Sequence, residues 1–322
     1  MTYVPARWLP GPHAMTVFAR LVRGPRGLAP RRERWELDDG DFLDVDRHGD
    51  PGGPTVVVLH GLEGSSRAPY VSRLVEAAGA HGLSAVAVNF RGCSGALNRL
   101  PRFYHSGETG DLARVVARLA AERPGRAIGV AGFSLGGNVV AKWLGERGDA
   151  LPPEVRGGAV ISVPFDLARC AAAIDEGRGM GRVYRERFLR TLRRKALAKL
   201  AVFPDLPFTA AEVRACRTFA AYDERVTSRL HGFDGALDYW TRASSGPSLA
   251  GVRRPLLAIS SEDDPIVPGD TLPRGAARAG GAFRLEVFPA GGHVGFVTGP
   301  PWRFEFFAEA RAASFLAAAL RR

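Results

Sequence analysis

Residues Gly132-Phe133-Ser134-Leu135-Gly136 form a G-x-S-x-G pentapeptide between a strand-like run and a helix-like run. The strand-like run covers 126–131 and the helix-like run covers 137–144. A serine on such a turn projects its hydroxyl from the edge of a parallel sheet, and the glycines permit a strained turn with a helix packed close behind it. The setting predicts that Ser134 is a nucleophile, whereas the pentapeptide alone is compatible with a plain glycine turn.

A nucleophilic serine needs a base and an acid, and both follow it in the chain. A histidine has to accept the proton of the serine, and a carboxylate has to hold the imidazole. An alternating strand pattern at 283–288 leads into a glycine-rich loop that carries His293, which we predict as the base. The acid is one of three aspartates that follow strands on this side: Asp166, Asp263 and Asp264.

Negative charge on a carbonyl oxygen under attack needs preorganised N–H donors, which form an oxyanion hole. The residue after the nucleophile, Leu135, supplies one donor. A buried-strand pattern at 55–60 leads into a glycine-rich loop, and the amide of Leu62 in this loop is the predicted second donor. His60 precedes the serine in the chain, so we interpret it as a residue that braces the loop.

Length and composition predict a soluble globular protein of 322 residues with one large core and room for an insertion. No apolar run approaches the length of a membrane span, and the first residues lack the apolar region of a signal peptide. Cys93, Cys170 and Cys216 are scattered without a C-x-x-C pair, which suits a reducing compartment better than disulfides or zinc. We therefore expect a cytoplasmic protein with no metal site.

A formal net charge of +11 raises the question of a nucleic-acid partner. Lys142, Lys195 and Lys199 are the only lysines, so arginine supplies nearly all of the basic excess. Together with the abundance of alanine and glycine, this pattern indicates a general amino-acid preference of the source organism. The sequence contains no zinc-finger, RRM or helix-turn-helix signature. We expect no nucleic-acid partner.

Strand and helix patterns alternate along most of the chain, which predicts a mostly parallel sheet with helices on both faces. A hairpin is expected within 31–47, before the first parallel strand. Further strands are expected at 55–60, 83–90, 126–131, 158–163, 255–260 and 283–288, with helices at 69–81 and 109–123. Ligands of such sheets bind beyond the carboxyl ends of the strands, where the loops of Ser134 and His293 fall.

The alternation stops between residues 164 and 251, where the pattern is mainly helical. We predict a helical cap inserted into an α/β core that consists of residues 1–163 and 252–322. Such a cap would shape the pocket and exclude water. Its segment 182–203 combines apolar residues at helical spacing with many basic ones. An ordinary cap helix with its apolar face inward explains this pattern, and transient contact with a membrane surface is the alternative.

Several stretches beyond the pentapeptide resemble the YheT-like branch of the α/β-hydrolases, which is related to the eukaryotic α/β-hydrolase-domain lipases. The resemblance runs nearly end to end and is carried by Pro12-His13 with Thr16, by 37–42, 60–66, 89–95, 104–108 and 132–138, by Tyr222-Asp223 with Thr227, and by 231–233, 238–240 and 291–296. The chain departs from the family pattern at Met15, where glutamine is usual, and at Trp240, where a second tyrosine is common.

The resemblance implies an α/β-hydrolase fold and cofactor-free hydrolysis of carboxylic esters, often acyl lipids or medium-chain esters. It assigns Ser134, Asp264 and His293 as the triad, because 264–268 resembles the D-x-x-V-P loop of the superfamily; Asp263 then braces its loop. The expected substrate is a short- to medium-chain acyl ester or an acyl lipid, cleaved through an acyl-enzyme. A thioesterase or small-peptide hydrolase with the same triad, or a non-catalytic ligand-binding protein, remains an alternative.

Overall fold

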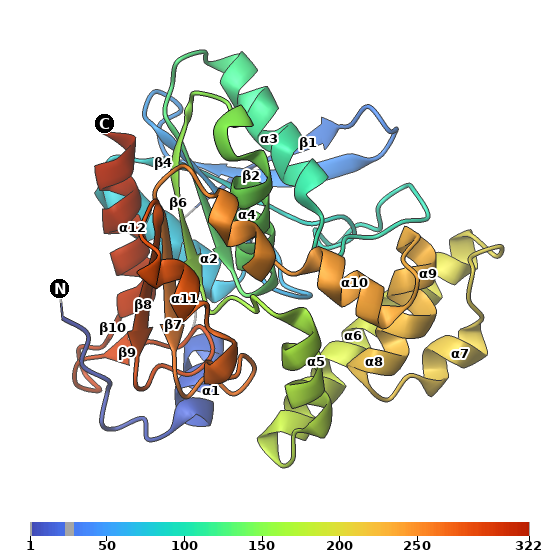
Figure 1. Cartoon of the computed structure of the whole chain (residues 1–322). Coiled ribbons are helices and arrows are strands. Elements are labelled where there is room, and N and C mark those ends of the chain that lie inside the picture. Colours follow the sequence, from blue (N-terminus) through green and yellow to red (C-terminus); the bar gives the residue numbers. More distant parts are fainter. Residues whose placement is uncertain (1, 23–28, 322) are drawn as a thin grey trace.

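An eight-stranded sheet forms the centre of the computed structural model, which describes residues 2–22 and 29–321 (Figure 1). The strand order is β1-β2-β4-β3-β5-β6-β7-β8. The strands are β1 (Arg31–Glu36), β2 (Phe42–His48), β3 (Thr55–Leu59), β4 (Ser84–Val88), β5 (Ile128–Phe133), β6 (Val155–Ile161), β7 (Leu256–Ser261) and β8 (Phe283–Phe288). The six strands from β4 to β8 in this order run parallel, and β2 is antiparallel to both of its neighbours. The predicted mostly parallel sheet and its hairpin are confirmed.

Helices cover both faces of the sheet, as Figure 1 shows. Those outside the 164–251 segment are α1 (Pro12–Leu21), α2 (Pro69–Ala80), α3 (Thr109–Glu122), α4 (Leu135–Arg147), α11 (Arg274–Arg278) and α12 (Phe307–Leu320). A short two-stranded sheet, β9 (Val297–Thr298) with β10 (Glu305–Phe306), precedes α12. The helices expected at 69–81 and 109–123 are α2 and α3.

The alternation of side chains along buried strands explains why helices are needed on both faces. In β3, Val57 and Leu59 pack into the core that α3 and α4 cover, while Val56 and Val58 pack into the core that α2 and α12 cover. Successive side chains of a strand point to opposite faces, so a strand that is apolar throughout has to be buried on both. The central strands are therefore covered on both faces, whereas the edge strand β1 exposes most of its side chains.

The segment between β6 and β7 is helical, and we call residues 164–251 the cap segment. Its helices are α5 (Leu167–Glu176), α6 (Met180–Val202), α7 (Ala210–Ala215), α8 (Phe219–Tyr222), α9 (Ser228–His231) and α10 (Ala236–Ala243). Figure 1 shows them gathered beyond one end of the sheet. Asn138 of α4 attaches this segment to the core, because its side chain donates to the Ala243 carbonyl at 2.8 Å and accepts the Ser245 amide at 2.9 Å. The division of the chain into core and cap stays a prediction.

The basic segment expected at 182–203 is α6, and not all of its basic side chains face solvent. Lys199 is fully buried, with its ammonium group 2.5 Å from the Asn98 carbonyl. Lys195 lies 2.6 Å from Glu63. These two lysines fix α6 to the loops of the core, whereas the helical spacing alone assigned them only to a polar face. Among the helices in the described ranges, α6 included, none is both long and apolar enough to cross a membrane.

A buried ion cluster around Arg91 fixes the β1–β2 hairpin to the core. The Arg91 guanidinium is fully buried and donates to Asp41 at 2.9 Å and to Asp111 of α3 at 2.7 and 2.8 Å. It also donates to Asp39 at 2.8 Å. Removal of one partner from such a cluster leaves an uncompensated buried charge, which is expensive. The cluster explains why two of the stretches that carry the family resemblance, 37–42 and 89–95, have charged residues in buried turns.

Arg91→Gln is expected to lower the free energy of unfolding by about 3–5 kcal/mol, because Asp41 and Asp111 would stay buried without their partner. Arg114→Gln is the matched control, since Arg114 pairs with the same Asp111 at 3.3 Å but is 39% exposed. An exposed pair of this kind contributes at most about 1 kcal/mol. Urea denaturation of the three proteins measures the difference. Equal losses in the two variants would contradict a dominant role of the buried cluster.

Candidate active site

Ser134 lies on the turn between β5 and α4 in a backbone conformation that side-chain-bearing residues rarely adopt. Its φ is 51° and its ψ is −121°. Such a conformation costs about 1–3 kcal/mol and persists only where the surroundings impose it. The Ser134 amide donates to the Ile161 carbonyl of β6 at 2.8 Å, which ties the turn to the neighbouring strand. The sheet thus places the hydroxyl of Ser134 at the carboxyl end of β5.

Glycines around Ser134 are required by close contacts between backbone segments. A Cβ atom at Gly136 would lie 2.5 Å from the His60 carbonyl oxygen, and one at Gly137 would lie 2.7 Å from Val163. At Gly61 a Cβ would approach the Cβ of Ser134 to 3.3 Å. Contacts below 3 Å leave no room for any side chain, so α4 packs against the β3 loop only because these positions are glycine.

His293 and Asp264 are joined by a hydrogen bond at the ends of β8 and β7. Nδ1 of His293 lies 2.9 Å from one carboxylate oxygen of Asp264 and 3.1 Å from the other. The same carboxylate accepts the amides of Ile266 at 2.8 Å and Val267 at 3.0 Å. Two backbone donors and one imidazole therefore fix the orientation of Asp264, whose side chain is 2% exposed. In the neutral tautomer with a proton on Nδ1, this bond is donated to the carboxylate and Nε2 can accept a proton.

Residues distant in sequence hold the His293 loop in place. Asp263 accepts the amides of Gly291 and Gly292, both at 2.9 Å, so it braces the histidine loop rather than its own turn. Thr16 of α1 accepts the amide of His293 at 2.9 Å. Ser162, which follows β6, accepts the amide of Val294 at 3.0 Å. No sequence motif surrounds Ser162, so this contact has no local signal in the sequence.

Asp166 and His60, the other polar candidates from the sequence, have structural hydrogen bonds away from the Ser134–His293 pair. Asp166 caps the N-terminus of α5, where its side chain accepts the Arg169 amide at 3.0 Å. His60 is fully buried, donates from Nδ1 to the Gly61 carbonyl at 2.7 Å and accepts the Phe90 amide at 3.2 Å. Burial lowers the pKa of His60 to about 4, so the ring is neutral and braces the loop. Within the described residues, the Ser134 hydroxyl makes no hydrogen bond to His293, a contact that often tightens only around substrate.

Leu62 and Leu135 line the same hollow as Ser134. Leu135 is the first residue of α4, where an amide has no partner within the helix. Neither amide donates a hydrogen bond to another residue in the described parts of the chain. Both are therefore available to an oxygen atom bound beside Ser134, as an oxyanion hole requires.

A cluster of Glu63, Tyr104 and Lys195 fixes the loop that carries Leu62. The Tyr104 hydroxyl accepts the Glu63 amide at 2.8 Å and donates to the Glu63 carboxylate at 2.8 Å. Lys195 of α6 donates to that carboxylate at 2.6 Å. Glu63 itself has a φ of 52°. The pairing joins residues 132 positions apart, and local sequence patterns carry no signal for such a contact.

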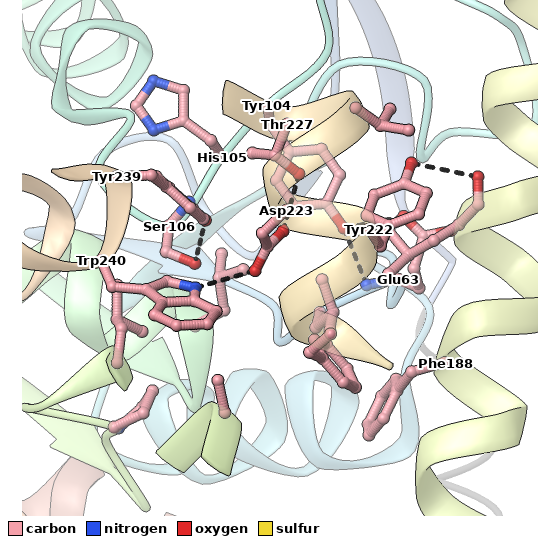
Figure 2. Close-up of a pocket in the computed structure, with 18 of the residues that line it drawn as sticks. Glu63, Tyr104, His105, Ser106, Phe188, Tyr222, Asp223, Thr227, Tyr239 and Trp240 are labelled. Atoms are coloured by element: carbon pink, nitrogen blue, oxygen red, sulfur yellow. Dashed lines mark hydrogen bonds between the residues drawn. The ribbon is translucent and has the colours of Figure 1, made fainter. Parts of the chain in front are cut away.

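A largely apolar cavity extends from Ser134 beneath the cap segment (Figure 2). Its lining includes Phe188 and Leu192 of α6, Trp240 of α10, and Ile266 of the Asp264 loop. Tyr104, His105 and Tyr239 contribute polar edges. Burial lowers the pKa of His105 to about 4, so its ring is neutral in this environment. Cavities lined mainly by apolar and aromatic side chains with a few fixed polar groups are typical of small-molecule sites.

Asp223 is a buried carboxylate on the wall of this cavity, as Figure 2 shows. It accepts the Trp240 indole N–H at 2.8 Å and the Thr227 hydroxyl at 2.7 Å. Burial raises its pKa from 3.8 to about 6. The residues 223–227 form a π-helical turn, a local irregularity that is frequent at functional sites. Trp240, the departure from the family pattern, therefore supplies one of the two hydrogen bonds to Asp223.

Comparison with known proteins identifies the family. Residues 54–300 match the family model described as alpha/beta hydrolase fold. Escherichia coli YheT, provisionally named an esterase, is 35% identical over 98% of this chain and 92% of its own length. A Saccharomyces cerevisiae monoacylglycerol lipase is 32% identical over 76% of this chain and 55% of its own length. Human phospholipase ABHD3 is 25% identical over 92% of this chain and 74% of its own length.

Solved structures agree on the fold. The Pyrococcus furiosus esterase Pf2001 superposes with a TM-score of 0.58 at 20% sequence identity, covering 93% of this chain and 98% of that one. At this identity the likeness speaks for the fold alone.

The pH dependence of stability is expected to change when Asp223 is replaced by asparagine. Because burial raises the pKa of Asp223 to about 6, the folded chain retains this proton between about pH 4 and pH 6 while the unfolded chain releases it. The carboxylate therefore lowers the stability of the wild type as the pH rises through this range, by up to about 3 kcal/mol. The free energy of unfolding of Asp223→Asn relative to wild type should increase from pH 4 to pH 7.

Asp234→Asn is the control for this experiment, because Asp234 lies in the same segment but is exposed. Its unfolding free energy should follow that of the wild type at every pH. A constant difference between Asp223→Asn and wild type from pH 4 to pH 7 would contradict a raised pKa in the folded chain.

Proposed function

The chain belongs to the α/β-hydrolase fold family, and from that premise we propose that Ser134, Asp264 and His293 are its catalytic triad. The enzyme is an ester hydrolase, as the names of its esterase, lipase and phospholipase relatives indicate. The observation that carries the triad is the hydrogen bond of 2.9 Å between His293 and Asp264 beside a serine held on a strained turn. Serine, imidazole and carboxylate in these settings are the parts that acyl transfer requires.

The reaction proceeds in two steps through an acyl-enzyme. His293 accepts the proton of Ser134 as the serine oxygen attacks the ester carbonyl, and the amides of Leu62 and Leu135 donate to the oxygen that becomes negative. The bond between the carbonyl carbon and the alcohol oxygen then breaks, and His293 returns the proton to the departing alcohol. Water, deprotonated by His293, attacks the acyl carbon, the bond between that carbon and Oγ of Ser134 breaks, and His293 returns the proton to the serine as the carboxylic acid leaves.

The cavity beneath the cap segment is the proposed site of the acyl group. Phe188, Leu192 and Trp240 contribute apolar surface to its lining. These contacts favour short- to medium-chain acyl esters or acyl lipids, because the apolar volume of the cavity limits the length of the acyl chain that fits. The exposed arginines of α6, Arg190 and Arg194 among them, would permit transient contact with an anionic membrane surface.

Ser134→Ala is expected to abolish hydrolysis of p-nitrophenyl butanoate while the chain stays folded. Loss of a triad nucleophile removes several orders of magnitude of rate and leaves the contributions of the oxyanion hole and of binding. A fluorophosphonate probe should label the wild type at Ser134 and leave the variant unlabelled, which mass spectrometry of the peptide detects. Near wild-type turnover by the folded variant would exclude this serine as the nucleophile.

Asparagine variants of the three aspartates test which of them is the acid of the triad, and we expect Asp264→Asn to lose the most activity. Asparagine keeps the shape of the side chain but loses the charge and the imposed tautomer of His293, a loss of about 10⁴ in kcat in the protease precedent. Asp166→Asn should stay within a few-fold of wild type, because Asp166 caps α5, and Asp263→Asn should fall between the two because it braces the loop. A crippled Asp166→Asn beside a nearly normal Asp264→Asn would overturn the assignment of the acid.

A further inference from the structure

A second hollow, separate from the cavity beneath the cap segment, also reaches Ser134. Its walls come from α1 and α6, and Ser134 and His293 lie in its lining. The two helices are in contact, since Nδ1 of His13 lies 3.1 Å from the Tyr184 hydroxyl. We call this hollow the α1–α6 groove. None of the motifs in the sequence indicated it, because α1 and α6 lie more than 150 positions apart.

The two hollows present different parts of the catalytic machinery. Leu135, one of the two oxyanion donors, lines the cavity beneath the cap but not the groove. His293 lines the groove but not the cavity. In acyl transfer the histidine gives its proton to the departing alcohol oxygen, so the alcohol part of the ester lies on the side of the imidazole. The acyl part then occupies the cavity, and the alcohol part occupies the α1–α6 groove.

Positive charge without a counter-ion marks the α1–α6 groove. Arg20 of α1 and Arg187 of α6 both line it, and its lining contains no carboxylate. Neither guanidinium forms an ion pair or a side-chain hydrogen bond with any residue in the ranges 2–22 and 29–321. Partial loss of hydration and the nearby charge of Arg20 lower the pKa of Arg187.

The outward continuation of the groove has the same charge. Arg20 and Arg187 also line this outer part, together with Arg67, for which the described residues supply no ion pair. Arg32 and Glu63 lie there as well, but each has its own partner: Arg32 binds Asp46 at 2.7 Å, and Glu63 binds Lys195 at 2.6 Å. The uncompensated charge along the path from His293 to solvent is therefore positive.

We propose that the alcohol part of the substrate lies in the α1–α6 groove and carries an anionic group, a phosphate or a carboxylate, that Arg20 and Arg187 bind. The planar guanidinium donates two parallel hydrogen bonds to such groups, and two arginines on facing helices can hold one anion between them. This inference rests on the proposed function, because it uses His293 as the proton donor to the alcohol. It adds a charge requirement for the alcohol, which the triad does not impose.

The test compares two soluble esters with the same hexanoyl group, one of 4-hydroxybenzoate and one of 4-hydroxybenzamide. The alcohols have nearly the same shape and differ in charge. Wild type should show a higher kcat/KM for the anionic ester, and Arg20→Gln and Arg187→Gln should each lower the ratio of the two kcat/KM values about tenfold, as expected for one charge-assisted hydrogen bond. Arg187→Glu should invert the preference, and added salt should weaken it in wild type.

Arg190→Gln is the matched control, because Arg190 lies on the same helix and is exposed, as Arg187 is, but lines neither the groove nor the cavity. Its ratio should equal that of wild type. Equal kcat/KM values for the two esters in wild type, or the same ratio in wild type and in both groove variants, would overturn the proposal. A loss of preference in Arg190→Gln as large as in Arg187→Gln would also overturn it, since general surface charge would then explain the effect.

A membrane surface is the competing source of an anion, and a separate arm distinguishes it. Wild type and the variants are sedimented with vesicles of phosphatidylglycerol. If Arg20→Gln and Arg187→Gln reduce vesicle binding and leave the ratio for the soluble esters unchanged, the arginines serve a lipid surface and the proposal is wrong. Failure of the proposed function gives another result, because wild type would then hydrolyse neither ester or Ser134→Ala would hydrolyse both.

Discussion

Backbone contacts too close for any side chain hold Ser134 in its strained conformation, and the rest of the site depends on them. The first turn of α4 lies against the loop after β3, where a Cβ at Gly136 would lie 2.5 Å from the His60 carbonyl. This approach brings the amides of Leu62 and Leu135 into one hollow beside the serine. If either segment moved back by the width of a methyl group, the two donors would no longer converge on one oxygen atom. The strained turn at Ser134 and the placement of Leu62 and Leu135 beside it thus rest on the same close backbone contacts.

The histidine side of the site is built differently, from hydrogen bonds rather than from close backbone packing. Asp263, Thr16 and Ser162 each accept one or two amides of the loop around His293. They come from the β7 loop, from α1 and from the end of β6, so three separate segments fix one imidazole. A loop with several positive φ values, such as that at Val294, would otherwise have many conformations of similar energy. The N-terminal helix is therefore part of the support of the site, although it lies outside the sheet.

Local patterns were sufficient to predict the elements of the sheet and the loops that meet at its carboxyl edge. The strand–turn–helix around Ser134 and the glycine-rich loop after β8 each contain their own signal, because turn chemistry is local. Asp166, Asp263 and Asp264 all follow strands, so strand patterns do not distinguish them, and only the resemblance of 264–268 to the D-x-x-V-P loop favoured Asp264. In the structure each aspartate has different hydrogen-bond partners. Asp166 accepts a helix amide, Asp263 accepts two loop amides, and Asp264 is bonded to the imidazole of His293. Long-range pairs such as Glu63 with Lys195, and the burial of Lys199, depend on the tertiary packing of α6 and have no local signal.

The net charge of +11 does not show by itself which arginines serve the fold and which could bind a ligand. The position of each arginine in the structure decides this. Arg91 and Arg73 are buried, and each is neutralised by carboxylates, so they serve the fold. Arg20 and Arg187 instead line a hollow that reaches His293, and the one described carboxylate in its outer part, that of Glu63, is paired with Lys195. Like charges held near one another raise the free energy of the empty site, and an anion that enters relieves this repulsion. An anion would therefore gain from both arginines at once, while a neutral group would leave their repulsion in place. The composition is a property of the whole chain, but the uncompensated charge of Arg20 and Arg187 lies in a hollow that reaches Ser134 and His293, where we propose that the alcohol part of the substrate binds.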